Sequence, residues 1–164
     1  RLQTITDRFS KIGSEPVLEK RDIIEDTKNT VDYLQTRVSQ QVVFTFKAPE
    51  HPIYVDINPA LHSWTIENLV KNAIDAMKGK GSLNIIISEL EDIVKISITD
   101  SGKGIPKNQF TKVFEPGFTT KKRGWGLGLS LTKRIVQEYH KGKIKVAHSE
   151  IGKGTTMQIS YKTA

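Results

Sequence analysis

Two asparagines with a helical spacing could bind a hard cation. Asn68 and Asn72 lie four residues apart in the segment ENLVKNAIDA, residues 67–76, so in a helix they share one face, which is not the apolar one. Amide oxygens suit Mg²⁺, which keeps several waters and needs only one or two protein oxygens when phosphates supply the others. Because two solvent-facing asparagines would show the same pattern, the pair indicates a metal site only together with other motifs.

A carboxylate follows the β-rich run at residues 93–99. Asp100 begins the segment DSGKGIP, residues 100–106, and shares its even-numbered parity with the apolar residues of the preceding run, so it is predicted to point inward. An inward carboxylate is costly unless it meets hydrogen-bond donors, and the amino group of an adenine ring is one such donor. Gly102 and Gly104 would let the backbone pass close to a flat ring. An Asp-x-Gly turn is the alternative, and the inward parity favours binding over it.

A glycine-rich segment runs directly into a predicted helix. Residues 114–129 read FEPGFTTKKRGWGLGL, with the basic cluster KKR at 121–123. Backbone N–H groups at the N-terminus of a helix bind phosphate well when glycines keep side chains out of the way. The spacing fits neither a P-loop nor a dinucleotide-binding turn, and a flexible loop is the alternative. Phe114 and Phe118 are expected to pack the segment against the body of the domain.

The elements that must position these segments follow from the spacing of apolar and breaking residues. Helical periodicity and capping residues predict four helices, over residues 1–12, 22–38, 59–77 and 127–139. Runs rich in β-branched residues predict strands at 42–46, 53–57, 83–88, 93–99, 143–148 and 155–161. The first two strands are expected to pair, the next two to form a hairpin, and the segment GKGTT at 152–156 to form the turn between the last two. This order predicts a mixed, mostly antiparallel sheet covered by helices on one face, an α/β (α+β) two-layer sandwich.

Composition narrows the class of protein. The chain has 164 residues, 37% of them hydrophobic, which suits a single domain with one modest core. It has no cysteine, hence neither a disulfide nor a thiolate metal site, and it shows no apolar run of membrane-spanning length and no signal-peptide pattern. Its formal charge of +7 fits nucleic acid, an anionic membrane or a phosphate-rich ligand. Because most lysines are spread along the chain and the one dense cluster lies in the glycine-rich segment, a small phosphate ligand is favoured.

In this order the segments resemble the nucleotide-binding boxes of the GHKL superfamily, and within it the catalytic domain of sensor histidine kinases. The boxes are matched by residues 68–73 (N box), 100–104 (first glycine box), 114–118 (F box), 124–128 (second glycine box) and 152–155 (third glycine box). The resemblance covers about residues 22–161 and is specific as an ordered set. It implies the Bergerat fold, with ATP bound between the helices under a mobile lid formed by residues 115–126.

The resemblance also implies roles for individual residues. Asn72, with Asn68 beside it, would bind Mg²⁺, and Asp100 would hydrogen-bond the adenine amino group. Thr155 would support the adenine through water, and Lys121 is the candidate for contacting the terminal phosphate. The other positions expected to line the ATP site are Gly102, Gly104, Ile105, Phe114, Thr119, Thr120, Gly124, Gly126, Leu127, Gly128 and Leu129.

Position 68 separates branches of the superfamily. The branches that resemble gyrase, mismatch-repair proteins and heat-shock chaperones place a glutamate there as general base for water, whereas Asn68 cannot take a proton at neutral pH. Glu67 is next to it but about 100° around the helix. Phosphoryl transfer to a protein acceptor is therefore expected in place of hydrolysis. No acceptor or base is predicted in this chain, because its four histidines precede Pro, Ser, Lys and Ser, where acceptor histidines usually precede an acidic residue.

The sequence thus predicts the ATP-binding kinase domain of a two-component sensor histidine kinase, acting in a phosphorelay on a histidine of a dimerisation domain absent from this chain. Residues 1–13 would be the tail of that domain with a linker, and residues 14–164 the catalytic domain. Expected partners are its own dimerisation and histidine-acceptor domain, a response regulator receiver domain and a second copy in a homodimer, with no nucleic acid. A cytoplasmic location is expected, with a membrane anchor elsewhere left open. The alternatives are an ATPase that drives a clamp, a serine kinase of the anti-sigma type and a nucleic-acid binder.

Overall fold

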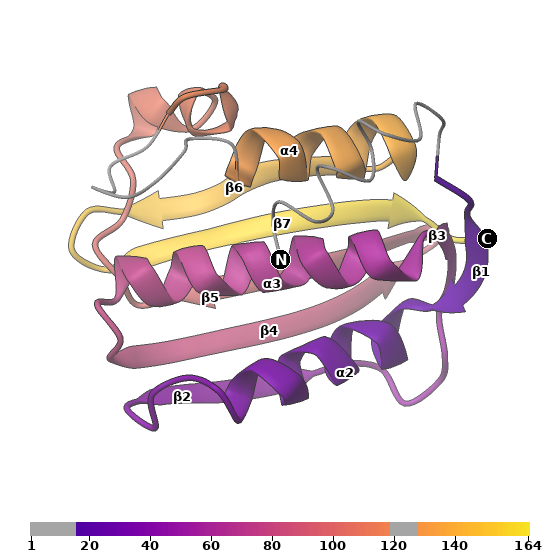
Figure 1. Ribbon diagram of the computed structural model, residues 1–164, viewed down its shortest axis with the longest axis horizontal. Helices are drawn as coiled ribbons and strands as arrows, with labels where there is room; N and C mark the ends of the chain where they lie inside the picture. The colour runs from indigo at the N-terminus through magenta and orange to yellow at the C-terminus, as the bar shows by residue number, and fades with distance from the viewer. Residues whose placement is uncertain (1–15, 119–127) are drawn as a thin grey trace.

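The computed structural model describes residues 16–118 and 128–164, which form a sheet layer with helices on one face (Figure 1). The order of elements is β1 (Glu19–Asp22), α2 (Ile23–Gln35), β2 (Val42–Lys47), β3 (Tyr54–Ile57), α3 (Pro59–Ala76), β4 (Gly81–Leu90), β5 (Ile93–Asp100), the 3₁₀ turns η1 (Lys107–Gln109) and η2 (Lys112–Phe114), α4 (Gly128–Arg134), the π-helical segment η3 (Ile135–Tyr139), β6 (Lys143–Glu150) and β7 (Gly154–Lys162). The predicted α/β two-layer sandwich is confirmed.

The main sheet has five strands in the order β2-β4-β5-β7-β6. β2 runs parallel to β4, and every other pair in this sheet is antiparallel, so the predicted mixed, mostly antiparallel sheet is confirmed, as is the hairpin of β4 and β5. The predicted pairing of 42–46 with 53–57 is wrong, because β3 pairs with β1 in a separate two-stranded sheet. Alternating hydrophobicity indicates which face of a strand is buried, but it does not identify the neighbouring strand.

α2 and α3 begin within one residue of the predicted starts at 22 and 59, and a side chain caps each of them. The carboxylate of Asp22 accepts a hydrogen bond from the backbone N–H of Ile24 at 3.1 Å and starts α2. Asn58 caps α3 in the same way, with its side-chain oxygen 3.1 Å from the backbone nitrogen of Leu61, and Pro59 occupies the first turn. Both helices bury an apolar stripe against the sheet, and each large side chain buried there contributes about 1.5–3 kcal/mol.

Within the described residues, the helix predicted over 127–139 consists of an α-helical part followed by a π-helical part. It is α-helical from Gly128 and becomes π-helical from Ile135, and the backbone N–H of His140 then bonds to the carbonyl of Ile135 at 2.9 Å. The left-handed residue after it is Lys141, with φ of 58°. The glycine at position 142 is required for packing, since a Cβ there would lie 2.4 Å from the ring of Tyr161.

The segment predicted as a helix over residues 1–12, and the boundary expected after residue 13, fall in residues 1–15, outside the described residues. The domain boundary therefore stays a prediction. Among the described residues no helix has the length and apolar character needed to cross a membrane.

Candidate functional site

The predicted site residues that the structure describes gather at one end of the sandwich. There α3 and β5 end, α4 begins, and the turn between β6 and β7 closes the sheet (Figure 1, left). Two backbone hydrogen bonds join these segments: Lys103 N–H donates to the carbonyl of Ala76 at 3.1 Å, and Gly152 N–H donates to the carbonyl of Lys103 at 2.8 Å. Three of the four predicted motifs are thus in direct contact, although the bonded residues lie 27 and 49 positions apart in sequence (76 to 103 and 103 to 152).

The asparagine pair lies on the half-buried side of α3. The amide nitrogen of Asn68 donates to Thr132 Oγ1 at 2.8 Å, and that hydroxyl donates to the carbonyl of Gly128 at 2.7 Å. These bonds orient the Asn68 amide and tie α3 to the first turn of α4. Thr132 is fully buried, and sequence reasoning missed it because a threonine inside an amphipathic helix carries no distinctive signal.

Asp100 points inward, as its parity predicted, and only 7% of its surface is exposed. Its Oδ1 accepts a hydrogen bond from Gly102 N–H at 2.8 Å. Burial raises the pKa of the carboxyl above its ordinary 3.8, against the opposing effect of hydrogen bonds from the backbone of Gly102 and Thr155. A carboxylate that is desolvated at the end of the central strand of the sheet is suited to meet a donor from a ligand.

Close packing against the protein's own backbone explains why glycine stands at positions 102 and 104. A Cβ at Gly102 would lie 2.7 Å from the backbone carbonyl of Ala76, and one at Gly104 would lie 2.3 Å from the carbonyl oxygen of Glu150. Gly104 also has φ of 81°, a left-handed conformation that favours glycine. Close approach is therefore required here, and the described partner is the protein backbone. The predicted approach to a flat ring stays a prediction.

Thr155 is 4% exposed and stands directly opposite Asp100 in the β5–β7 register. Its hydroxyl lies 2.8 Å from Ser149 Oγ on β6, and Ser149 in turn accepts a hydrogen bond from the backbone N–H of Ile105 at 2.7 Å. Ser149 was missed by sequence reasoning. Its inward position depends on a β-bulge between Val146 and His148 that shifts the register of β6, and the sequence carries no sign of this bulge.

The glycine-rich segment is described only at its two ends. Phe114 is buried, and Phe118 packs against the core, which confirms their predicted packing role. Lys133 Nζ lies 5.9 Å from the centre of the Phe114 ring, so α4 covers this side of the segment. Gly128 and the half-buried Leu129 begin α4. The predicted site residues outside the described residues are Thr119, Thr120, Lys121, Gly124, Gly126 and Leu127, together with most of the predicted lid.

The donor set at this end of the molecule fits a metal ion only together with a ligand. Residues 16–118 and 128–164 contain no group of three or more His, Cys, Asp or Glu side chains that could hold a metal ion. Asn68 and Asn72 could supply one or two amide oxygens, which matches Mg²⁺ when phosphates and water complete its shell.

Glu67 is turned away from this end, as predicted. It is 7% exposed, lies 3.5 Å from Lys71 Nζ, and faces α2. There it lines a groove of about 300 Å³ together with Asn29, Thr30, Tyr33 and Ser63.

Two of the four histidines are buried far from solvent. Burial lowers the pKa of His62 to about 3, helped by the nearby His140, and burial lowers the pKa of His140 to about 4. His62 Nε2 lies 2.8 Å from Thr27 Oγ1, and His140 Nε2 accepts from the backbone N–H of Asn58 at 3.1 Å. Of the exposed pair, His51 contacts Glu89 at 2.9 Å. Both buried imidazoles thus have their described polar contacts inside the fold.

Comparison with known proteins agrees with this geometry. The family model described as histidine kinase-, DNA gyrase B-, and HSP90-like ATPase matches residues 60–164. Sensor histidine kinase ZraS of Escherichia coli (strain K12) is 40% identical over 121 residues, 74% of this chain and 26% of ZraS. The chain therefore spans about a quarter of that relative.

Solved structures give the same fold. The nucleotide-free catalytic domain of histidine kinase ThkA matches with a TM-score of 0.79 and 26% identity, over 88% of this chain and 95% of that one. ThkA in complex with the response regulator protein TrrA matches with a TM-score of 0.80 and 26% identity, over 100% of this chain and 48% of that one.

Proposed function

The chain belongs to the family of histidine kinase-, DNA gyrase B- and HSP90-like ATPases, and we propose that it is the ATP-binding kinase domain of a two-component sensor histidine kinase. The family confirms the resemblance drawn from the ordered motifs, and ATP use follows from it. The observation that carries the kinase proposal is Asn68, which stands where a hydrolytic branch needs a base and is hydrogen-bonded through its amide nitrogen to Thr132.

Adenine recognition is assigned to Asp100. The carboxylate is desolvated, so a donor from the ligand gains more there than in water. The amino group of adenine is such a donor, and the carbonyl that guanine carries at the same ring position is not. Gly102, Gly104 and Ile105 hold the loop beside it, and Thr155 supports the base through water.

The phosphates are assigned to the opposite side of the site. Asn72, with Asn68 beside it, would hold Mg²⁺, which when bound neutralises charge on the phosphates. The glycines from 124 to 128 would present backbone N–H groups, and Lys121 would add a positive charge at the terminal phosphate. Residues 115–126 are proposed to act as a lid over them.

The proposed reaction is phosphoryl transfer to histidine. The bond between the γ-phosphorus and the β–γ bridging oxygen breaks, a bond from a histidine nitrogen to that phosphorus forms, and ADP leaves. The acceptor is assigned to the dimerisation domain, because His62 and His140 are buried. The base is also assigned outside this chain, because Glu67 faces α2. This chain contributes positioning and electrostatic stabilisation.

The partners follow from the same proposal. ThkA is known in complex with a response regulator, and a response regulator receiver domain is proposed as the final phosphoryl acceptor here. The full-length protein is proposed to be a homodimer through its dimerisation domain, with this domain on the cytoplasmic side where ATP is available.

Transfer of label from γ-labelled ATP tests the proposal. We expect no stable label on this chain alone, and acid-labile label on a separately supplied dimerisation domain when this chain is present. Acid-stable label would indicate a serine kinase, and steady release of phosphate by this chain alone would indicate a clamp ATPase.

A further inference from the structure

The side chain of Ser149 joins three segments of the proposed adenine site. Its Oγ accepts from the backbone N–H of Ile105 at 2.7 Å, donates to the carbonyl of Gly154 at 3.0 Å, and lies 2.8 Å from Thr155 Oγ1. One hydroxyl thus ties the loop after Asp100 to both strands that close the sheet.

The number of protons on these groups fixes the direction of each bond. A serine hydroxyl has one proton and two lone pairs. The carbonyl of Gly154 can only accept and the N–H of Ile105 can only donate, so the proton of Ser149 goes to Gly154 and one lone pair goes to Ile105. All three contacts are hydrogen bonds only if Thr155 donates its own proton to the second lone pair of Ser149.

This direction decides what Thr155 can offer to a ligand. With its proton held by Ser149, the hydroxyl of Thr155 keeps only lone pairs for other groups. Asp100, directly opposite in the register, offers carboxylate oxygens. Both groups are then acceptors, so this edge of the site matches a donor on the base, reached directly or through a water that accepts from the base and donates to Thr155.

We propose that Ser149 is a positioning residue that fixes the hydroxyl of Thr155 as an acceptor, and thereby helps the site to select a purine with an amino group at position six. The proposal rests on the proposed function, since it presumes that a purine nucleotide binds beside Asp100. Ser149 acts through Thr155 and Ile105 without touching the base, so its effect appears in the choice between bases.

The test uses ATP and inosine triphosphate, which carries a carbonyl at position six in place of the amino group. In Ser149→Ala the hydroxyl of Thr155 is free to turn and donate, so the preference for ATP over inosine triphosphate should fall about two- to tenfold, the range of one neutral hydrogen bond. Calorimetric dissociation constants for both nucleotides, in the presence of magnesium, measure that ratio.

Thr155→Val should lower the ratio to a similar level, and the double variant should lower it no further, because the two residues act as one unit. Ser149→Thr keeps the hydroxyl and should restore the wild-type ratio. Ser88→Ala, which removes an exposed serine of β4, should change neither constant. If Ser149→Ala does not fold, Ser149→Cys, whose thiol is a weak donor, takes its place against Ser149→Thr.

An equal loss of affinity for both nucleotides in Ser149→Ala, with the ratio unchanged, would show a merely structural role and overturn the inference. Strict additivity of Ser149→Ala and Thr155→Val would also overturn it. If either outcome is found while the wild-type chain still binds ATP, this inference is wrong and the proposed function is unaffected. A wild-type chain that binds neither nucleotide overturns both.

Discussion

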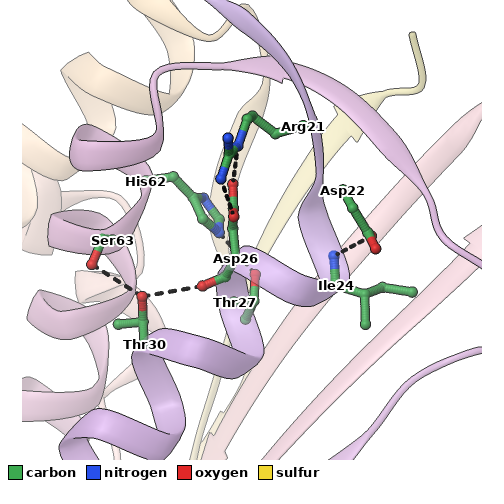
Figure 2. A network of polar contacts seen from close by, with 8 residues as sticks. All are labelled: Arg21, Asp22, Ile24, Asp26, Thr27, Thr30, His62 and Ser63. Carbon is green, nitrogen blue, oxygen red and sulfur yellow. Dashed lines mark hydrogen bonds and ion pairs between the residues drawn. The ribbon is translucent and has the colours of Figure 1, made fainter.

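Helix α3 carries polar residues of two kinds along its length. In its N-terminal half, polar side chains contact polar side chains of α2: His62 lies 2.8 Å from Thr27 Oγ1, and Ser63 accepts from Thr30 at 3.0 Å (Figure 2). In its C-terminal half, Asn68 and Asn72 stand at the end of the sandwich where Asp100 and the glycine-rich segments meet. The first group holds two helices together, and the second surrounds a site.

The difference lies in how each polar group meets its hydrogen-bonding needs. In the α2–α3 contact, defined by Arg21, Asp26, Thr27, Thr30, His62 and Ser63, most partners come from the protein, as in the ion pair of Arg21 with Asp26 at 2.9 Å. The exception is the buried Nδ1 of His62, which has no hydrogen-bond partner in the described part of the chain. Asp100 instead is desolvated enough that its pKa rises. A protein accepts such a cost where a ligand offsets it. Burial of a polar group, or a pKa shift caused by burial, therefore does not by itself identify a site. Asp100 differs from His62 in standing among the predicted nucleotide-binding motifs.

The largest expected effect is a loss of stability in acid, which follows from the buried histidines His62 and His140. Burial depresses the pKa of His62 and His140 to about 3 and about 4, against an ordinary 6.5. Their contribution to stability is fully present above pH 6.5 and is lost as the pH falls towards those values, because the unfolded chain takes up protons first. We expect the free energy of unfolding to fall by several kcal/mol, roughly 1 kcal/mol per pH unit for each imidazole, between pH 6.5 and pH 4.

Urea denaturation across that pH range measures the loss. The variant His62→Gln cannot take up a proton, so its stability should depend less steeply on pH. A wild-type stability that is level from pH 6.5 to pH 4 would mean that these histidines are not held neutral by the fold.

Removing the proposed metal ligand should affect the site and spare the fold. In Asn72→Ala we expect phosphoryl transfer to the dimerisation domain to fall about 100-fold, of the order seen when one catalytic polar group is removed. Stability should stay within about 0.5 kcal/mol, because Asn72 lies off the buried stripe of α3. The rate of phosphoryl transfer and the stability in urea are measured for the wild type and for Asn72→Ala. A variant that is unfolded would show that Asn72 is needed for the fold.

Substitutions in the α2–α3 contact should lower stability and leave the nucleotide site unaffected. Thr30→Val and Ser63→Ala should each lower stability, with a coupling of about 0.5–1.5 kcal/mol between them. The affinity for ATP should stay unchanged, because Thr30 lies on α2 and Ser63 lies in the N-terminal half of α3. A double-mutant cycle measured by urea denaturation gives the coupling. A parallel change in ATP affinity would show that the α2–α3 contact also affects the nucleotide site, against this prediction.

The smallest effect is expected from Asp100→Asn on the protein without nucleotide. A raised pKa means that the neutral carboxyl is favoured in the fold, so the stability that it contributes is present below its ordinary 3.8 and is lost as the pH rises through the raised value. At pH 7 the variant should be as stable as the wild type or up to about 1 kcal/mol more stable. Its amide oxygen can still accept from Gly102. A clear loss of stability in urea denaturation would make Asp100 a structural residue.

Local chemistry in the sequence predicted much of this architecture. Asp22 caps α2 and Pro59 lies in the first turn of α3, as predicted, and the alternation along β5 correctly predicted that Asp100 points inward. These features depend on residues close in sequence. The pairing of β3 with β1, and the inward position of Ser149, depend on tertiary contacts and on a bulge, and no local pattern encodes them.

The burial of Thr132 and His62 was the other feature that the sequence did not predict. Thr132 and His62 are fully buried, yet each is a residue type that is found inside and outside proteins. The motifs indicated where a site should lie, whereas the hydrogen bonds that orient it, between Asn68 and Thr132 and between Thr155 and Ser149, appear only once the chain is folded.

Calorimetric titration of the wild type and of Asp100→Asn with ATP and GTP tests most directly that the end of the molecule around Asp100 is a site for adenine. The wild type should prefer ATP, and the variant should lose about 1–3 kcal/mol of ATP affinity, because a donor then faces the amino group. Its GTP affinity should fall less. Equal affinity of the wild type for both nucleotides, or an unchanged ATP affinity in the variant, would contradict this assignment.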